Sequence, residues 1–143
     1  MIAENNFFIE TFLYKFGTNR KMTEEEKAYY AAPYPTVASR KPVETWHKEI
    51  PFDGKGSANY DEIYAYSQWL EASTVPKLLL YAKPGMILKK DVVAQIQQDF
   101  IALESVYVGI VKHFLQVDHP HEIGKALKSW AEGIKSTTTA KAN

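Results

Sequence analysis

The chain has 143 residues, which is the length of one domain or of part of one. Its 17 basic and 17 acidic residues cancel, which leaves no electrostatic reason to bind nucleic acid or an anionic membrane. Cysteine is absent, so disulfides, thiolate catalysis and cysteine-based zinc sites are excluded.

No run reaches the roughly 18 apolar residues that are needed to span a bilayer. Residues 1–6 lack the basic segment and apolar core of a secretory signal, so we expect a soluble, cytoplasmic protein. Aromatic residues make up 13% of the chain, which is more than a minimal core requires and suits the wall of an apolar pocket.

The first half of the chain is predicted to be helical. Phe8, Phe12 and Phe16 recur at helical spacing, and such a stripe is either part of a core or the wall of a substrate site. Thr23 and Glu26 have the spacing of a capping box, which predicts the start of a helix. The expected segments are a helix over 6–16, a helix from 24 to about 31, a loop over 32–40, a helix over 42–47, a flexible connection over 51–59 and a helix over 60–72.

The second half alternates strands with helices. Residues 77–82 and 105–108 are continuously apolar runs, typical of strands that are buried on both faces of a parallel sheet. Helices are predicted over 90–103 and 120–134, so this half forms a right-handed βαβα unit of the α/β class. Residues 136–143 form a polar tail that we expect to be disordered.

Two parallel strands make a poor sheet by themselves, because even a hairpin of two antiparallel strands is marginal in water. Strands this apolar need neighbours at their edges and helices on their faces. The sequence therefore predicts further strands upstream or a partner chain that pairs with the exposed sheet edge.

His113 is the main candidate catalytic residue, because it lies just after the second predicted strand. The carboxyl ends of parallel strands are where α/β enzymes place their chemistry. An imidazole that is neutral near pH 7 is a competent general base. The alternative is a loop histidine that is satisfied by local hydrogen bonds.

A second group of polar residues follows the same loop and raises the question of a metal site: Asp118, His119, His121 and Glu122. The simpler interpretation is a helix N-terminus, with Pro120 in its first turn and an acidic side chain stabilised by the helix dipole. We expect no metal site and no cofactor, since adjacent ligands at a helix start rarely converge on one ion.

A resemblance to a known protein family covers about residues 4 to 134. The matching stretches occur in the same order as in that family and at nearly the same spacing. They are Glu4–Thr11, Arg20–Glu26, Ala32–Pro35, Arg40–Pro42, Lys48–Pro51, Val75–Leu80, Pro84–Gly85, His113–Gln116 and Glu122–Gly124. On these residues the chain resembles the C-terminal half of the haloalkane dehalogenases. It is equally similar to their relatives, the coelenterazine-using luciferases of Renilla type.

The resemblance implies a partial α/β-hydrolase fold, in which a helical cap segment precedes the last two parallel strands and the C-terminal helix. Residues 1–74 match the cap and its return, residues 75–135 match the end of the hydrolase core, and residues 136–143 are the tail. The family reaction is hydrolytic cleavage of a carbon–halogen bond. An Asp nucleophile forms an alkyl-enzyme ester, and a histidine then activates the water that hydrolyses it.

By the same resemblance His113 matches the catalytic histidine. The positions that match the apolar wall around a small apolar substrate are Phe8, Phe12, Trp46, Ile50, Ile87 and Phe114. The family's nucleophile has no counterpart in this sequence, so we expect the isolated chain to be inactive. The family also has glycine where this chain has Val111, and a β-branched residue resists positive φ. If that turn needs positive φ, His113 is aimed differently here.

Three hypotheses stay open at this point. The first is a haloalkane dehalogenase-like hydrolase that lacks the half carrying the nucleophile and is inactive by itself. The second is a luciferase-like oxidoreductase that uses coelenterazine without a metal. The third is a non-catalytic fragment or interaction module, which self-associates through its exposed sheet edge or pairs with a complementary N-terminal half.

Overall fold

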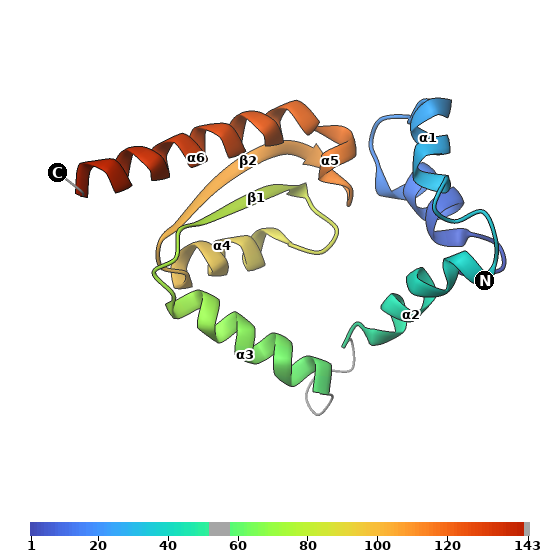
Figure 1. The fold of residues 1–143 in the computed structure, drawn as a ribbon, viewed down its shortest axis with the longest axis horizontal. Helices are drawn as coiled ribbons and strands as arrows, with labels where there is room; N and C mark the ends of the chain where they lie inside the picture. The colour runs from blue at the N-terminus through green and yellow to red at the C-terminus, as the bar shows by residue number, and fades with distance from the viewer. Residues whose placement is uncertain (52–57, 142–143) are drawn as a thin grey trace. The chain divides into compact units, whose positions relative to one another are not determined.

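The computed structural model describes residues 1–51 and 58–141 (Figure 1). The chain divides into two compact units, Met1–Trp69 and Leu70–Asn143, and each is described by itself. The sequence led us to expect the boundary after residue 74. Most of the expected connection at 51–59 lies outside the described residues.

The first helix of unit 1, η1 (Phe7–Gly17), is a π-helix that buries Ile9, Leu13 and Gly17. The expected helix over 6–16 is therefore confirmed, but its buried face is not the phenylalanine stripe. Phe16 is 56% exposed, and Phe8 and Phe12 are only half-buried. The buried residues Ile9, Leu13 and Gly17 recur at the same four-residue spacing as the phenylalanines, so the helical period was predicted correctly and the buried face is displaced by one residue.

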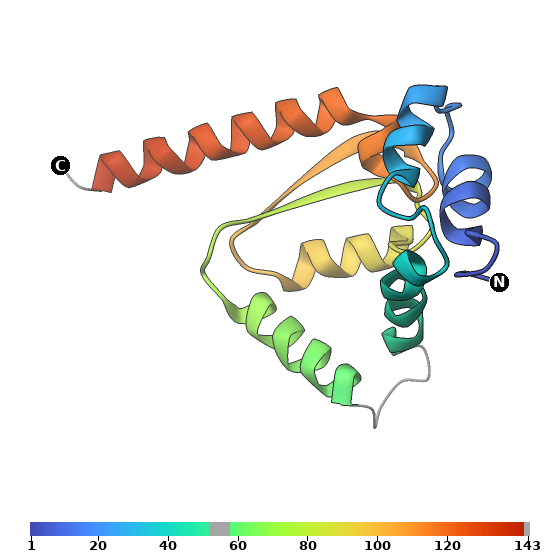
Figure 2. The ribbon, with the colours of Figure 1, turned by 45° about the vertical axis from the view of Figure 1, so that its right-hand side comes forward.

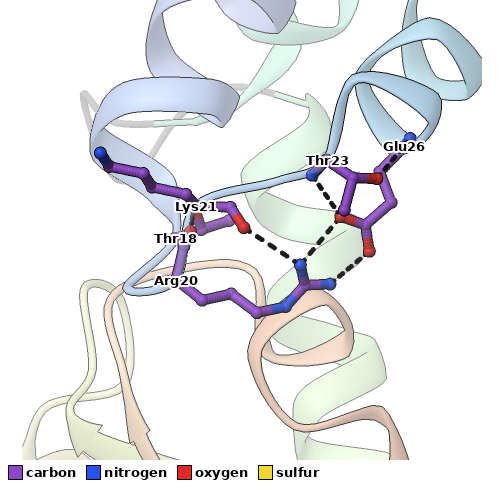
Figure 3. Close-up of polar contacts among 5 residues, drawn as sticks. All are labelled: Thr18, Arg20, Lys21, Thr23 and Glu26. Carbon is purple, nitrogen blue, oxygen red and sulfur yellow. Dashed lines mark hydrogen bonds and ion pairs between the residues drawn. The ribbon is translucent and has the colours of Figure 1, made fainter.

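Helix α1 (Glu24–Ala31) begins at the predicted capping box. Thr23 Oγ1 accepts from the Glu26 amide at 3.2 Å, and the Glu26 carboxylate accepts from the Thr23 amide at 2.8 Å. Figure 3 shows the Arg20 guanidinium reaching the same carboxylate, with Nη1 2.8 Å from Oε2 and Nη2 on the other oxygen. The hydrogen bond from Arg20 is the main cause that lowers the pKa of Glu26 from 4.5 to about 2.

Two side chains link segments of unit 1 that lie apart in the sequence. The Tyr14 hydroxyl donates to the Lys27 carbonyl at 2.6 Å and joins η1 to α1. The Arg40 guanidinium donates to the carbonyls of Ala3 and Tyr34, each at 3.0 Å. The elements that follow α1 are η2 (Ala38–Arg40), inside the expected loop, then α2 (Lys41–Glu49) and α3 (Ala58–Ala72), both close to their expected bounds.

Unit 2 contains a two-stranded parallel sheet of β1 (Lys77–Pro84) and β2 (Leu103–Val111). Both strands are longer than expected. The register shifts between Tyr81, which pairs with Tyr107, and Ala82, which pairs with Gly109, so Val108 is an extra residue on β2. This is a β-bulge, and Gly109 takes a φ of +136° there.

Helix α4 (Lys90–Asp99) connects the two strands and ends earlier than the expected 90–103. Phe100 has extended dihedral angles and Ala102 a φ of +51°, so the chain turns before β2 begins. The short helix α5 (Leu115–Asp118) follows β2 and was not predicted. Figures 1 and 2 show α4 on one side of the sheet and the last helix, α6 (Pro120–Lys141), on the other.

The core of unit 2 lies between the sheet and the start of α6. Ala82, Val108 and Val111 are buried in it, and the half-buried residues packed on them are Leu80, Leu115 and Ile123. Helix α6 begins at Pro120 as expected but continues to Lys141. It thus includes residues 136–141 of the expected disordered tail, because no proline or glycine follows Gly133 to end it.

The expectation that residues 105–108 are buried on both faces of the sheet is wrong for this structure, because apolar side chains on β2 remain exposed. Val106 is 37% exposed, Tyr107 46% and Ile110 67%. Within residues 1–51 and 58–141 the sheet has no third strand. Helices that are long and apolar enough to cross a membrane are absent from this part of the chain.

Candidate active site

His113 lies two residues beyond the end of β2, at the carboxyl edge of the sheet. Val111, the last residue of the strand, is fully buried and fixes where the chain leaves the core. Two backbone hydrogen bonds then extend the sheet contact past the strand ends. The Gly85 amide donates to the Val111 carbonyl at 3.3 Å, and the Met86 amide donates to the Lys112 carbonyl at 2.7 Å.

A cavity of about 240 Å³ opens beside this histidine. The end of β1, the turn that follows it and the start of α5 supply most of the wall. The lining residues are Leu80, Tyr81, Ala82, Gly85, Met86, Ile87, Leu88, Lys112, His113 and Leu115. Most of these side chains are apolar, so the cavity suits a small apolar molecule placed beside a single imidazole.

Partial burial lowers the pKa of His113 from its ordinary value of 6.5, because the charged imidazolium loses solvation. The ring is therefore neutral at pH 7 and has a lone pair with which to accept a proton. The Phe114 ring contacts it edge-on, with 4.6 Å between ring centroids. This contact restricts the orientation of the imidazole.

Val111 does not disturb the turn before His113 in the way that the sequence suggested. The non-glycine residues with positive φ in the described ranges are Asn6 and Ala102, so Val111 continues the strand with negative φ. The left-handed positions near the site belong to Gly85 and Gly109 instead. The concern that a β-branched residue re-aims the histidine therefore does not apply to this structure.

Four of the other expected pocket residues lie in unit 1. Phe8 and Trp46 line a second cavity of about 360 Å³, together with Tyr34, Pro42 and Val43. Phe12 stacks on Phe8 at 5.5 Å between centroids. Ile50 is half-buried at the C-terminal end of α2.

The His47 ring joins this aromatic group. Its centroid lies 4.6 Å from that of Phe8 and 5.2 Å from that of Trp46, both edge-on. The Val43 carbonyl lies 2.7 Å from its Nδ1, which orients the ring. Of the six expected wall positions, the structure thus brings Phe8, Phe12 and Trp46 together in one unit, and Ile87 and Phe114 around His113 in the other.

Sequence reasoning missed the packing of His119 on the bulge in β2. A Cβ added to Gly109 would lie 2.5 Å from His119 Nε2, so the imidazole occupies the space that a side chain would fill. The same nitrogen lies 3.3 Å from the Ile110 carbonyl oxygen. The sequence contains no signal for this contact, because the two residues are ten positions apart and His119 lies in the connection between α5 and α6.

The expected helix start at Pro120 also accounts for the polar cluster near it. His119 Nδ1 lies 3.6 Å from Glu122 Oε2, which is an ordinary contact at a helix N-terminus. No group of three or more His, Cys, Asp or Glu side chains is placed to hold a metal in the part of the chain that the structure describes.

Comparison with known proteins gives a consistent result in sequence and in structure. A haloalkane dehalogenase of Bradyrhizobium diazoefficiens is 33% identical over 136 residues, which are 95% of this chain and 44% of the relative. A haloalkane dehalogenase of Mesorhizobium japonicum is 34% identical over 131 residues, which are 91% of this chain and 42% of the relative. No protein-family model matches the chain.

Among solved structures, haloalkane dehalogenase DbeA from Bradyrhizobium elkani superposes with a TM-score of 0.91 at 34% sequence identity. The match covers 96% of this chain and 47% of that one. The resemblance drawn from the sequence is therefore confirmed for the dehalogenases, and these relatives lend no support to the luciferase alternative. The chain is thus a relative of the haloalkane dehalogenases, with a partial α/β-hydrolase fold, and spans less than half of their length.

Proposed function

We propose that this chain provides the general base and part of the apolar wall of a haloalkane dehalogenase-type hydrolase, and that its substrate is a small haloalkane. The observation that supports the proposal most directly is the His113 imidazole. It is half-buried beside an apolar cavity of about 240 Å³ at the carboxyl end of β2, and its pKa is lowered.

His113 acts in the hydrolytic half of the reaction implied by the resemblance. A neutral ring nitrogen accepts a proton from water while the water oxygen attacks the carbonyl carbon of the alkyl-enzyme ester. The bond between the carbonyl carbon and the alkoxide oxygen then breaks, the imidazolium returns its proton to the leaving alkoxide to give the alcohol, and the carboxyl group ionises to regenerate the carboxylate. Because burial favours the neutral imidazole, the base is in its active protonation state throughout the neutral pH range.

The attacking carboxylate must come from outside the cavity wall described above. None of the ten residues that line the cavity is an aspartate or a glutamate. We infer that a complementary segment supplies this group and, with it, the strands that would pair with the exposed sheet edge. The 143-residue chain alone is therefore expected to release no halide from a brominated alkane.

The experiment tests this chain as part of a complete dehalogenase. Residues 4–134 replace the matching segment of the Bradyrhizobium diazoefficiens dehalogenase, and halide release is followed with a brominated alkane. We expect turnover by the chimera and its loss in His113→Phe. The control is His121→Phe, which changes an exposed histidine of α6 and leaves turnover intact.

Two results would contradict the proposal. A folded chimera in which His113→Phe turns over as fast as its parent would show that this histidine is not the base. Halide release by the 143-residue chain alone, abolished by His113→Phe, would show that the attacking group lies within the chain.

A further inference from the structure

The turn after β1 contacts the segment that carries His113. Pro84 pairs with Val111 at the end of the sheet, and the two amides that follow continue the contact. Gly85 N donates to the Val111 carbonyl at 3.3 Å, and Met86 N donates to the Lys112 carbonyl at 2.7 Å. The second of these bonds ends on the residue just before His113, so movement of the turn would be transmitted to the imidazole.

Gly85 has a conformation that other residues rarely adopt. Its φ is +66°, and a Cβ would lie 2.6 Å from the Leu88 carbonyl oxygen and 3.2 Å from the Ala82 carbonyl oxygen. Both are backbone atoms, which cannot rotate away as a side chain does. A side chain at this position would therefore push the turn outward and stretch the Met86 hydrogen bond.

A third contact holds the same turn from the side of α4. The Lys89 ammonium donates to the Gly85 carbonyl at 3.1 Å. The turn is thus held at one carbonyl and two amides, while its side chains, Met86, Ile87 and Leu88, form one wall of the cavity beside His113.

We propose that Gly85 and Met86 are positioning residues: their backbone fixes the direction of the His113 imidazole and keeps the cavity wall closed against it. This inference rests on the proposed function, because it specifies how the base is held. It assigns the role to main-chain atoms, so substitutions of the Met86 side chain alone are expected to matter less than a Cβ at Gly85.

The test is a nuclear magnetic resonance titration of the His113 ring in the full 143-residue chain, together with hydrogen exchange of the Met86 amide. In Gly85→Ala we expect the His113 midpoint to shift upward toward 6.5, because the displaced wall admits water to the ring. The Met86 amide should exchange about tenfold faster, since it has lost its acceptor.

Two glycine variants serve as controls. Gly124→Ala adds a methyl group that has no atom within 4 Å apart from the backbone of its own helix, so it should change neither the His113 midpoint nor the exchange of the Met86 amide. Gly109→Ala strains the chain at a different contact, with His119, and should destabilise unit 2 without raising the His113 midpoint. A midpoint in Gly85→Ala that stays at the parent value, or moves no more than in Gly109→Ala, would reduce Gly85 to a merely structural glycine and overturn the proposal.

If Gly85→Ala does not fold, the unmodified chain still decides the question. Protection of the Met86 amide comparable to that of the β1 amides supports the proposal, and exchange at the rate of an unprotected amide overturns it. Neither the His113 titration nor the exchange of the Met86 amide requires turnover. A failure of halide release in the chimera would therefore count against the proposed function without being confused with a failure of this inference.

Discussion

Replacing Gly109 by alanine is expected to destabilise unit 2, because two independent costs arise at this position. The residue has a φ of +136°, a region that is essentially restricted to glycine. The new Cβ would also lie 2.5 Å from Nε2, 2.7 Å from Cε1 and 2.9 Å from Cδ2 of His119. The His119 ring must therefore move, and its contact with the Ile110 carbonyl at 3.3 Å is lost.

The magnitude follows from these two contributions. A non-glycine residue held in such a backbone region costs about 1–3 kcal/mol. A lost hydrogen bond adds about 0.5–1.5 kcal/mol, and together we expect about 2–4 kcal/mol. Because the imidazole can rotate away from the new Cβ, the backbone contribution is expected to be the larger of the two.

Urea unfolding followed by circular dichroism measures the change in the free energy of unfolding. The double variant Gly109→Ala with His119→Ala separates the two costs. Removing the ring should relieve the clash and give a coupling energy of about 1 kcal/mol, while the backbone cost remains. Gly124→Ala is the matched control and should be neutral or slightly stabilising, by up to about 1 kcal/mol. A Gly109→Ala variant as stable as its parent would refute this account of the bulge.

Two further predictions concern unit 1. Glu26→Gln removes a carboxylate whose pKa in the folded state is lowered to about 2. The stability that this carboxylate contributes is therefore present above its unfolded pKa of 4.5 and is lost as the pH falls toward 2. The difference in urea midpoint between parent and variant should therefore shrink between pH 5 and pH 2, and a difference that is independent of pH would contradict the assigned ion pair. Tyr14→Phe removes the hydroxyl that donates to the Lys27 carbonyl at 2.6 Å and should cost about 0.5–1.5 kcal/mol in the same assay. No loss is expected from Tyr29→Phe, because Tyr29 is 80% exposed.

The features that could be predicted from the sequence are those encoded over short distances. The capping box of Thr23 and Glu26 involves four consecutive residues, and its geometry is set by the helix itself. The apolar run before Pro84 identified β1, since a short, continuously apolar run is typical of a strand in a parallel sheet. The position of His113 after β2 followed from the same reasoning.

The features that were missed depend on contacts between distant segments. The extension of β2 to Val111 is stabilised by pairing with Pro84, which the pattern of β2 alone does not reveal. The bulge at Val108 and the space that His119 occupies at Gly109 are products of tertiary packing. The phenylalanine stripe predicted a helix correctly but gave the wrong buried face, because Ile9 and Leu13 have the same spacing as the phenylalanines and the spacing alone does not select between the two faces.

The candidate site was predicted in part. His113 and Ile87 line one cavity, and Phe8 and Trp46 line another in a separate unit, so the resemblance identified residues that do gather around cavities. It did not reveal the backbone bonds from Gly85 and Met86 to the histidine segment. Their roles as substrate wall remain predictions.

The central claim is that His113 acts only after the carbon–halogen bond has broken. Mass spectrometry of the chimera carrying His113→Phe, exposed to excess brominated alkane, tests this order most directly. The account predicts one equivalent of released halide and a stable protein adduct heavier by one alkyl group, because the ester forms but water is not activated. Continued halide release without an adduct would contradict it.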